Sequence, residues 1–89
     1  MKMTADISMY PLDSNYVPPI ESFIRALRRF SGLEIVTNQL STQIRGEFSD
    51  VMPALSECMR ESMTSDRKVV FVARFLNADL DIGTLPQID

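Results

Sequence analysis

Hydrophobic and polar residues alternate near the beginning of the chain. Over residues 4–10, Ala5, Ile7 and Met9 fall on one side, and the positions between them are polar or aromatic. A repeat of two residues is typical of a β-strand with one apolar face. Pro11 follows, and we expect the strand to end there because proline has no N–H to offer a neighbouring strand.

The apolar positions then change to a helical spacing over residues 18–31. Pro18 and Pro19 suit a first helical turn, where N–H groups have no partner inside the helix. The apolar stripe that follows, at intervals of three and four residues, consists of Ile20, Phe23, Ile24, Leu27 and Phe30. Gly32 is expected to cap the C-terminal end of this helix, since glycine adopts a left-handed backbone easily.

Two strands are predicted next, at residues 33–38 and 41–48, joined by a two-residue turn at Gln39–Leu40. This register is self-consistent because it sets the acidic Glu34 against the basic Arg45. The other opposed pairs are Ile35 and Ile44, Val36 and Gln43, Thr37 and Thr42, and Asn38 and Ser41. Gln-Leu is not a favoured turn pair, so a slip of one residue or a longer loop stays open as an alternative.

A second helix is predicted over about residues 50–64, capped by Ser49 or Asp50, with Pro53 inside its first turn. The last predicted strand covers residues 68–76 and is apolar on both faces, apart from one arginine. Such a strand is usually central in its sheet and covered from both sides. We therefore expect it to be buried on both faces.

The order of these elements is strand, helix, strand, strand, helix, strand. That order is the split βαβ pattern, which predicts an α+β fold, a ferredoxin-like βαββαβ sandwich. In this fold a four-stranded antiparallel sheet carries both helices on one face. The opposite face of the sheet is therefore left open.

Length and composition indicate one globular domain with a tendency to assemble. We assign the 89 residues to a single domain, 1–89, with a core of about residues 4–76 and a C-terminal tail at 77–89. Small domains bury a small fraction of their surface, yet 45% of the residues are hydrophobic. We therefore expect further burial between copies of the chain.

The charge pattern argues against nucleic-acid binding. The formal net charge is -3, and Arg25, Arg28 and Arg29 form the one tight basic cluster. No apolar run approaches the roughly 20 residues of a membrane span, and the first residues lack a signal-peptide core. A cytoplasmic location without membrane insertion is the resulting expectation.

The residue types needed for common catalytic sites are missing. The chain has no histidine, which is the commonest general base and metal ligand, and a single cysteine, Cys58. Ser-His-Asp and Cys-His arrangements and thiolate metal clusters are therefore excluded. The three glycines are isolated and form no phosphate-binding loop. We expect no catalytic residue, no metal site and no cofactor, and hence no enzyme.

The predicted open face of the sheet mixes apolar and polar side chains. Val36, Val70 and Val72 supply an apolar floor. The polar groups expected to converge on it are Ser8, Tyr10, Ser41, Gln43 and Arg45. Such a surface suits a small-molecule pocket, and it also suits a dimer of stacked sheets.

Simpler roles for several of these residues stay open. Glu34 and Arg45 also fit an exposed cross-strand ion pair, which contributes under about 1 kcal/mol. Asp6 is equally consistent with a solvated carboxylate or a partner of Arg74. Tyr10, next to a proline, is also consistent with a packing residue at a strand end.

Short motifs in this order resemble the thiamine/hydroxymethylpyrimidine-binding YkoF-like domains. The first strand carries their S-x-Y-P pattern at Ser8, Tyr10 and Pro11. Their T-x-x-x-S-T-x-x-x-G hairpin, often with arginine before the glycine, matches Thr37, Ser41, Thr42, Arg45 and Gly46. An acidic-capped second helix follows, and the match covers about residues 4–76.

The resemblance implies a ferredoxin-like domain that binds thiamine or its hydroxymethylpyrimidine precursor without transforming it. It also implies pairing of domains through their sheets. We expect a homodimer or homotetramer and a link to a thiamine-precursor transporter. The alternative is a regulatory or assembly module whose open sheet face serves only to join subunits.

The candidate ligand-binding residues are Ser8, Tyr10, Asn38, Ser41, Thr42 and Gln43, with Arg45 and Asp6 as lesser candidates. Serine, threonine and amide side chains both donate and accept hydrogen bonds, as an aminopyrimidine requires. Thr42 carries the resemblance but points towards the helices in the predicted register. Either the turn is longer than two residues, or the ligand lies at the edge between the sheet and the helices.

Overall fold

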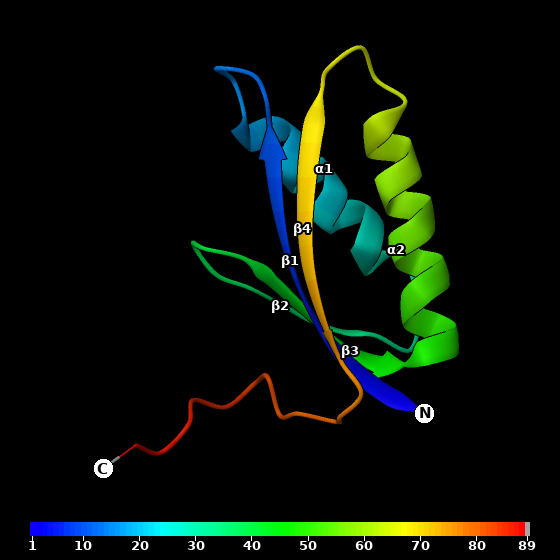
Figure 1. Cartoon of the computed structure of the whole chain (residues 1–89), viewed down its shortest axis with the longest axis vertical. Coiled ribbons are helices and arrows are strands. Elements are labelled where there is room, and N and C mark those ends of the chain that lie inside the picture. The colour runs from blue at the N-terminus through cyan, green and yellow to red at the C-terminus, as the bar shows by residue number, and fades with distance from the viewer. Residues whose placement is uncertain (89) are drawn as a thin grey trace.

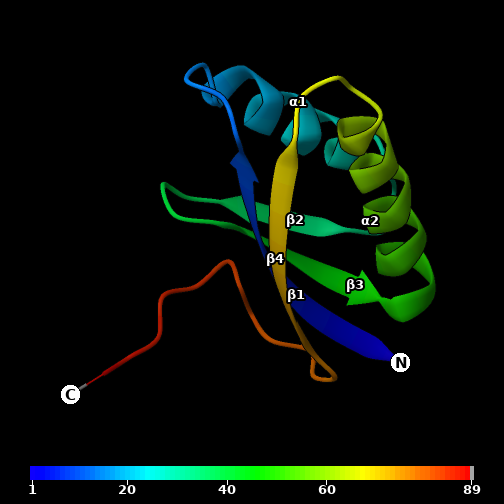
Figure 2. The ribbon, with the colours of Figure 1, turned by 45° about the horizontal axis from the view of Figure 1, so that its top comes forward.

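A computed structural model describes residues 1–88 of the chain. The elements are β1 (Lys2–Pro11), α1 (Val17–Arg28), β2 (Glu34–Thr37), β3 (Thr42–Glu47), α2 (Phe48–Met63) and β4 (Val69–Leu76). The strands form one antiparallel sheet in the order β2-β3-β1-β4. Both helices cover the same face of this sheet (Figure 1, Figure 2). The predicted ferredoxin-like sandwich is confirmed.

The core fills the space between the helices and the sheet. Its largest fully buried side chains come from both helices and from β3, and they are Leu27, Ile44, Leu55, Val51 and Cys58. On β1, Met3, Ala5 and Ile7 point into this core, as their alternation predicts. Burial of these aliphatic groups is the main stabilising term, at about 25 cal/mol for each Å² removed from water.

The hairpin has the predicted register. Glu34 lies opposite Arg45, and the other pairs run to Thr37 opposite Thr42. The backbone N–H of Asn38 donates to the carbonyl of Ser41 at 3.1 Å, which closes a two-residue turn. The longer loop is therefore excluded, and Thr42 points towards the helices.

Both helices begin earlier in the chain than predicted. α1 runs from Val17 to Arg28, and Gly32 lies in the turn beyond its end with φ 80° instead of capping it. α2 begins at Phe48, so the predicted caps lie inside the helix, and no side chain caps its N-terminus. Pro53 consequently lies within α2, beyond the first turn. The chain passes directly from β3 into α2, with no separate capping residue between them.

The prediction of a central last strand is wrong. β4 pairs only with β1 and forms one edge of the sheet. Its apolar side chains are exposed: Val72 and Phe75, from opposite faces, are each 53% accessible. The hydrophobic pattern reports how apolar a strand is, whereas the position of the strand depends on which neighbours pair with it. This unprotected apolar edge stays uncovered in one copy of the chain.

The C-terminal tail lies against the open face of the sheet, below the hairpin in Figure 1. The hydroxyl of Thr4 donates to the carbonyl of Ala78 at 2.8 Å and accepts from the N–H of Leu80 at 3.1 Å. Thr4 is only 8% exposed as a result. Towards its end the tail leaves the sheet, and Leu85 is 89% exposed.

Candidate functional site

A notch opens where the hairpin and β1 separate. Pairing between β1 and β3 ends at Ile7 and Thr42, while β1 continues to Pro11 beside β4 alone. The ribbon views show the tip of the β2–β3 hairpin diverging from β1 (Figure 1, Figure 2). A cavity of about 90 Å³ lies in this notch, roofed by the α1 side chains Ile20, Phe23 and Ile24. The notch thus joins one apolar wall to the polar end of the hairpin.

The polar wall of the notch is built from short neutral side chains. They are Ser8, Thr37, Asn38, Ser41 and Thr42. The hydroxyls of Thr37 and Thr42 lie 3.1 Å apart and share a hydrogen bond. Thr42 is 6% exposed, because it faces the helices. Hydroxyl and amide groups beside an aliphatic wall are what a small, flat, polar ligand requires.

Asn38 shapes the turn that carries this wall. Its side-chain oxygen Oδ1 accepts hydrogen bonds from the N–H of Leu40 at 2.9 Å and of Ser41 at 3.1 Å. This turn is a common use of asparagine, and it satisfies two N–H groups at the hairpin tip. The amide NH₂ of Asn38 makes no hydrogen bond within residues 1–88 and remains available as a donor.

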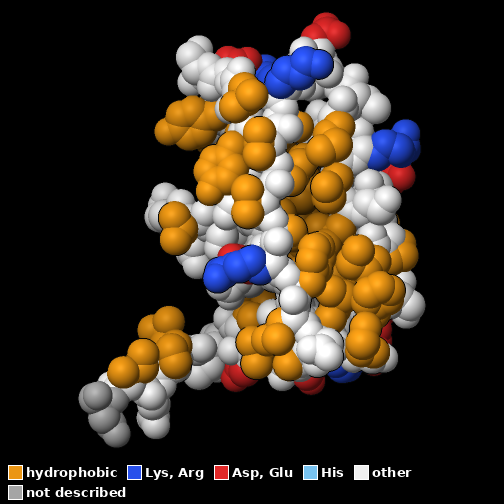
Figure 3. Space-filling view, in the orientation of Figure 1, with side chains coloured by type: hydrophobic (Ala, Val, Ile, Leu, Met, Phe, Trp, Pro, Cys, Tyr) orange, Lys and Arg blue, Asp and Glu red, His pale blue; other side chains and the backbone are white. Residues whose placement is uncertain are grey.

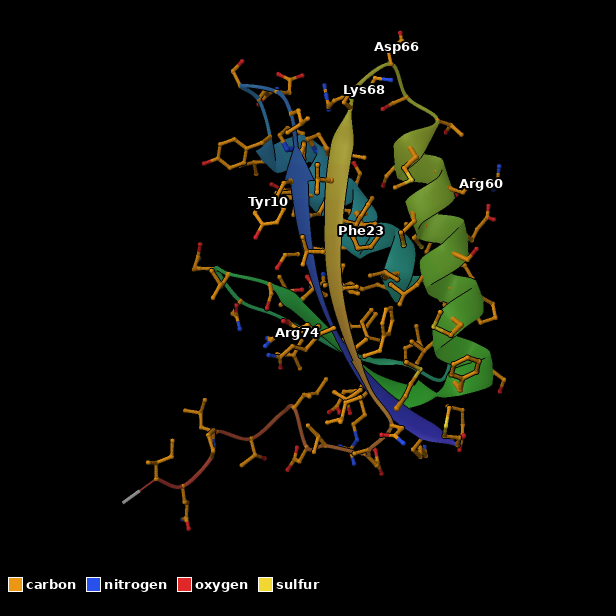
Figure 4. The ribbon with its side chains drawn as sticks, in the orientation of Figure 1. Tyr10, Phe23, Arg60, Asp66, Lys68 and Arg74 are labelled. Atoms are coloured by element: carbon orange, nitrogen blue, oxygen red, sulfur yellow. The ribbon has the colours of Figure 1, made fainter. Side chains whose placement is uncertain are left out.

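Asp6 lies on the open face, behind the notch. Its Oδ2 accepts from Nε of Arg74 at 3.2 Å and from Nη2 at 2.6 Å. The nearby Ser41 hydroxyl, followed by the Arg74 guanidinium, lowers the pKa of Asp6 below its usual value. Within the described chain, its buried Oδ1 has no partner that satisfies hydrogen-bond geometry. Arg74 reaches across β1 in Figure 4, so of the two simpler roles left open for Asp6 the structure shows the pair with Arg74.

Arg45 forms an ion pair with the tail. Its Nε donates to Asp79 at 2.6 Å, and its Nη1 donates to Glu34 at 3.3 Å. These two carboxylates, Asp79 foremost, raise the pKa of Arg45 above its already high usual value. The cross-strand pair with Glu34 is thus confirmed. Arg45 holds the tail in place and does not line the notch.

Gln43 and Tyr10 also lie outside the notch. Gln43 lines a hollow of about 310 Å³ on the open face, together with Asp6, Leu80 and Ile82. Tyr10 lies opposite Val70 and is 53% exposed. In Figure 4 its ring projects from the upper part of β1. The structure therefore brings Ser8, Asn38, Ser41 and Thr42 together in the notch. Asp6 lies next to Ser41 but does not line the notch, and Tyr10, Gln43 and Arg45 lie outside it.

Sequence reasoning missed Thr37 and the α1 side chains as components of the site. Thr37 belongs to the hairpin motif and lies opposite the candidate residue Thr42, so a signal exists in the sequence. The α1 residues Ile20 and Ile24 read as core from their helical spacing, and both are only partly buried. Incomplete burial of an apolar stripe cannot be read from its periodicity.

Two negative findings concern residues 1–88. No cluster of three or more histidine, cysteine, aspartate or glutamate side chains in this range is arranged to hold a metal ion. None of the helices formed by these residues is both long and apolar enough to cross a membrane.

Comparison with known proteins finds one matching family and several similar structures. The model of the YKOF-related family matches residues 2–78. No curated protein matches the chain. Protein SP2199 from Streptococcus pneumoniae has a similar structure, with a TM-score of 0.80 at 20% identity, over 90% of each chain.

Two further structures share the fold. Protein MJ1052 from Methanocaldococcus jannaschii is 20% identical with a TM-score of 0.75, over 94% of this chain and 88% of that one. TM0486 from Thermotoga maritima, provisionally named a thiamine biosynthesis or salvage protein, is 19% identical with a TM-score of 0.73. That match covers 97% of this chain and 90% of TM0486.

Proposed function

This chain belongs to the YKOF-related family, and from that premise we propose that it is a non-enzymatic, cytoplasmic binding protein for thiamine or its hydroxymethylpyrimidine precursor. The family and the similarity to TM0486 support a small-molecule binding role. The notch between β1 and the hairpin is the observation that carries the proposal. Of the other predicted site residues, Asp6 and Arg45 form ion pairs, and Gln43 and Tyr10 lie outside the notch.

The chemistry of the notch suits an aminopyrimidine. The ring offers an amine donor and nitrogen acceptors at its edge, and hydroxyl groups meet both kinds. Ser41 and Thr42 would contact this edge, and the free amide NH₂ of Asn38 would donate to a ring nitrogen. Ile20 and Ile24 would cover the face of the ring. The cavity volume of about 90 Å³ suits the pyrimidine ring, with any thiazolium ring directed outward.

Calorimetric titration with hydroxymethylpyrimidine and with thiamine tests this proposal. We expect saturable heat with at least one of the two ligands, and recovery of that ligand unchanged by mass spectrometry. Ser41→Ala should weaken binding by about 1–3 kcal/mol, because it leaves a polar group of the bound ligand unpaired. Ser14→Ala, at an exposed serine between β1 and α1, is the matched control. Absence of heat and of any thermal shift with both ligands would overturn the proposal.

A second candidate function is that of an assembly module, and the exposed β4 edge favours it. Val70, Val72 and Leu76 are each 45% or more exposed on the open face. Figure 3 shows apolar side chains spread over the face that contains β1 and β4. Exposed apolar patches on an unpaired edge strand are common sites of subunit contact. We propose that copies of the chain assemble through this sheet into a homodimer or homotetramer.

Light scattering at micromolar concentration tests assembly independently of ligand. The wild-type protein should have the mass of two or four chains, and Val72→Lys should shift it to one chain while keeping the fold. Val17→Lys, which places the same charge on an exposed valine of α1, should leave the mass unchanged. A monomeric wild type would contradict assembly. An oligomer without ligand binding would favour the assembly module alone.

A further inference from the structure

A second and larger cavity lies between the two helices, away from the polar end of the hairpin. Its volume is about 210 Å³, and residues from β1, α1, α2 and β4 line it. Its floor is apolar, formed by Phe23, Ala26 and Val69 among others. Phe23 is 3% exposed and packs against Phe71 with ring centroids 5.0 Å apart. Figure 4 shows Phe23 between the sheet and the helices, so the cavity reaches into the core.

The cavity carries one acidic and one basic side chain. Glu61, on α2, accepts a hydrogen bond from Arg29, just beyond the end of α1, at 3.3 Å. Arg67 lies near the start of β4, where its Nε donates to Asp13 at 2.9 Å. The two charges thus belong to different parts of the rim. The serine hydroxyls of Ser22 and Ser62 also line the cavity and add neutral donors and acceptors.

Both charged groups retain unused hydrogen-bonding capacity. The pair between Glu61 and Arg29 is exposed, with side-chain accessibilities of 48% and 68%, so it is weak and easily exchanged. Oε1 of Glu61 accepts no hydrogen bond from residues 1–88. Arg67 uses only Nε for Asp13, which leaves its terminal nitrogens as a fork suited to a carboxylate.

We propose that this cavity is a second binding site, for a small zwitterion with an apolar carbon skeleton, in other words a free amino acid. Its carboxylate binds Arg67, its ammonium group binds Glu61, and its carbon skeleton covers Phe23 and Val69. A singly charged ligand would bind only one of these two side chains. A purely apolar ligand would leave both charges unused. This site is separate from the notch and does not depend on the function proposed for it.

The single cysteine provides a direct readout of occupancy. Cys58 lines the cavity and is fully buried. Burial, followed by the charge of Glu61, raises the pKa of its thiol, so its reaction with alkylating reagents at neutral pH is slow. A bound ligand should slow that reaction further by blocking access. Because the chain has one cysteine, all modification occurs at this position.

The test measures the alkylation rate of Cys58 with a small maleimide, with and without leucine, 5-aminopentanoate, pentanoate or pentylamine. We expect saturable protection by leucine or by 5-aminopentanoate. Stronger protection by leucine would show that the two charged groups of the ligand lie at one end of its carbon skeleton. Stronger protection by 5-aminopentanoate would show that they lie at opposite ends. The singly charged compounds should protect less. Protection is expressed as the ratio of the alkylation rates with and without ligand. Glu61→Gln and Arg67→Gln should each abolish protection. Lys68→Gln is the control and should retain it.

Three results would overturn the proposal. The first is an alkylation rate unchanged by both zwitterions at saturating concentration. The second is zwitterion protection that survives Glu61→Gln and Arg67→Gln. The third is protection of Cys58 by hydroxymethylpyrimidine that survives Ser41→Ala, which would assign this cavity to the ligand proposed for the notch. Ser41→Ala separates the two sites, because it should weaken pyrimidine binding and leave zwitterion protection intact.

Discussion

Thr37 and Thr42 form a hydroxyl pair at the base of the notch. Their oxygen atoms lie 3.1 Å apart, and Thr42 is 6% exposed, so Thr37 is the hydrogen-bond partner of a buried hydroxyl. Thr37→Val leaves the buried hydroxyl of Thr42 unpaired, which should cost about 1–3 kcal/mol in the free energy of unfolding. The double variant Thr37→Val/Thr42→Val removes both partners and should be at least as stable as the single variant.

The same double variant should lose ligand affinity although it stays folded. Urea unfolding gives the stability, and calorimetry with hydroxymethylpyrimidine gives the affinity. Thr84→Val, at an exposed threonine in the tail, is the matched control for both measurements. A double variant less stable than Thr37→Val would show that the pair interacts with the core in some other way. Unchanged affinity would remove this pair from the ligand site.

Asp6 makes the stability of the fold depend on pH. Ser41 and Arg74 lower its pKa in the folded protein below the value of 3.8 expected in the unfolded chain. Its stabilising contribution is therefore complete above pH 3.8 and is lost as the pH falls through the lower, folded-state pKa. Asp6→Asn should reduce the loss of stability between pH 7 and pH 3, because this variant binds no proton at that position.

Urea unfolding of both proteins at the two pH values measures this difference. The control is Asp66→Asn, at an exposed aspartate at the apex of the loop between α2 and β4 in Figure 4. If Asp6→Asn and the wild type lose stability equally on acidification, the linkage through Asp6 is absent.

At the scale of elements, Gly46 explains why a glycine ends the hairpin motif. Gly46 is buried on β3, and a Cβ atom there would lie 2.8 Å from the carbonyl oxygen of Gly32 and 3.3 Å from Leu33. The first of these is a backbone atom, which cannot move aside as a flexible side chain can. The glycine therefore allows the turn between α1 and β2 to pack closely against β3, and it is a structural residue.

Gly46→Ala should accordingly destabilise the fold by about 1–3 kcal/mol through overpacking. Gly83→Ala is the matched control, because a Cβ there would meet its nearest neighbour at 3.4 Å, an ordinary contact with an exposed side chain. Its effect should stay within about 0.5 kcal/mol. Thermal or urea unfolding compares the two variants, and equal stability would show that the α1–β2 turn shifts at no cost.

The hairpin and the last strand show how far sequence reasoning reaches at this scale. The register of β2 and β3 could be predicted because the residues that face one another are close in the chain and alternate in type. The edge position of β4 could not be predicted, because apolar residues on both faces indicate that a strand becomes buried and do not indicate which segment covers it. The helix starts were misplaced for a local reason, since Ser49 and Asp50 are strong capping residues that the fold does not use as caps.

The candidate site was predicted only in part, because contacts between residues far apart in the chain decide which side chains reach it. Ser41 and Thr42 are adjacent in one motif and reach the notch together. Gln43 and Arg45 share the open face with Ser41, but they lie further along β3, beside the tail. The path of the tail depends on contacts more than thirty residues apart, such as Arg45 with Asp79, and no local pattern encodes it.

For the whole molecule, the tail is the segment whose attachment can be tested most directly. It is held at two places, by Arg45 through Asp79 and by the Thr4 hydroxyl through Ala78 and Leu80. Arg45→Met keeps an unbranched side chain and removes the ion pairs of the guanidinium with Glu34, Asp79 and Asp81. We expect faster amide hydrogen exchange at residues 78–82 in this variant, since the tail then keeps the Thr4 hydrogen bonds but loses its ion pairs with β3.

Ligand affinity separates this structural role of Arg45 from the binding role that the family resemblance implies. Arg45 lies outside the notch, so Arg45→Met should leave the affinity for hydroxymethylpyrimidine unchanged while Ser41→Ala weakens it. Arg28→Met, at an exposed arginine of α1, should change neither exchange nor affinity. If Arg45→Met instead weakens binding as much as Ser41→Ala does while residues 78–82 stay protected, Arg45 contacts the ligand, and the site extends from the notch across the open face.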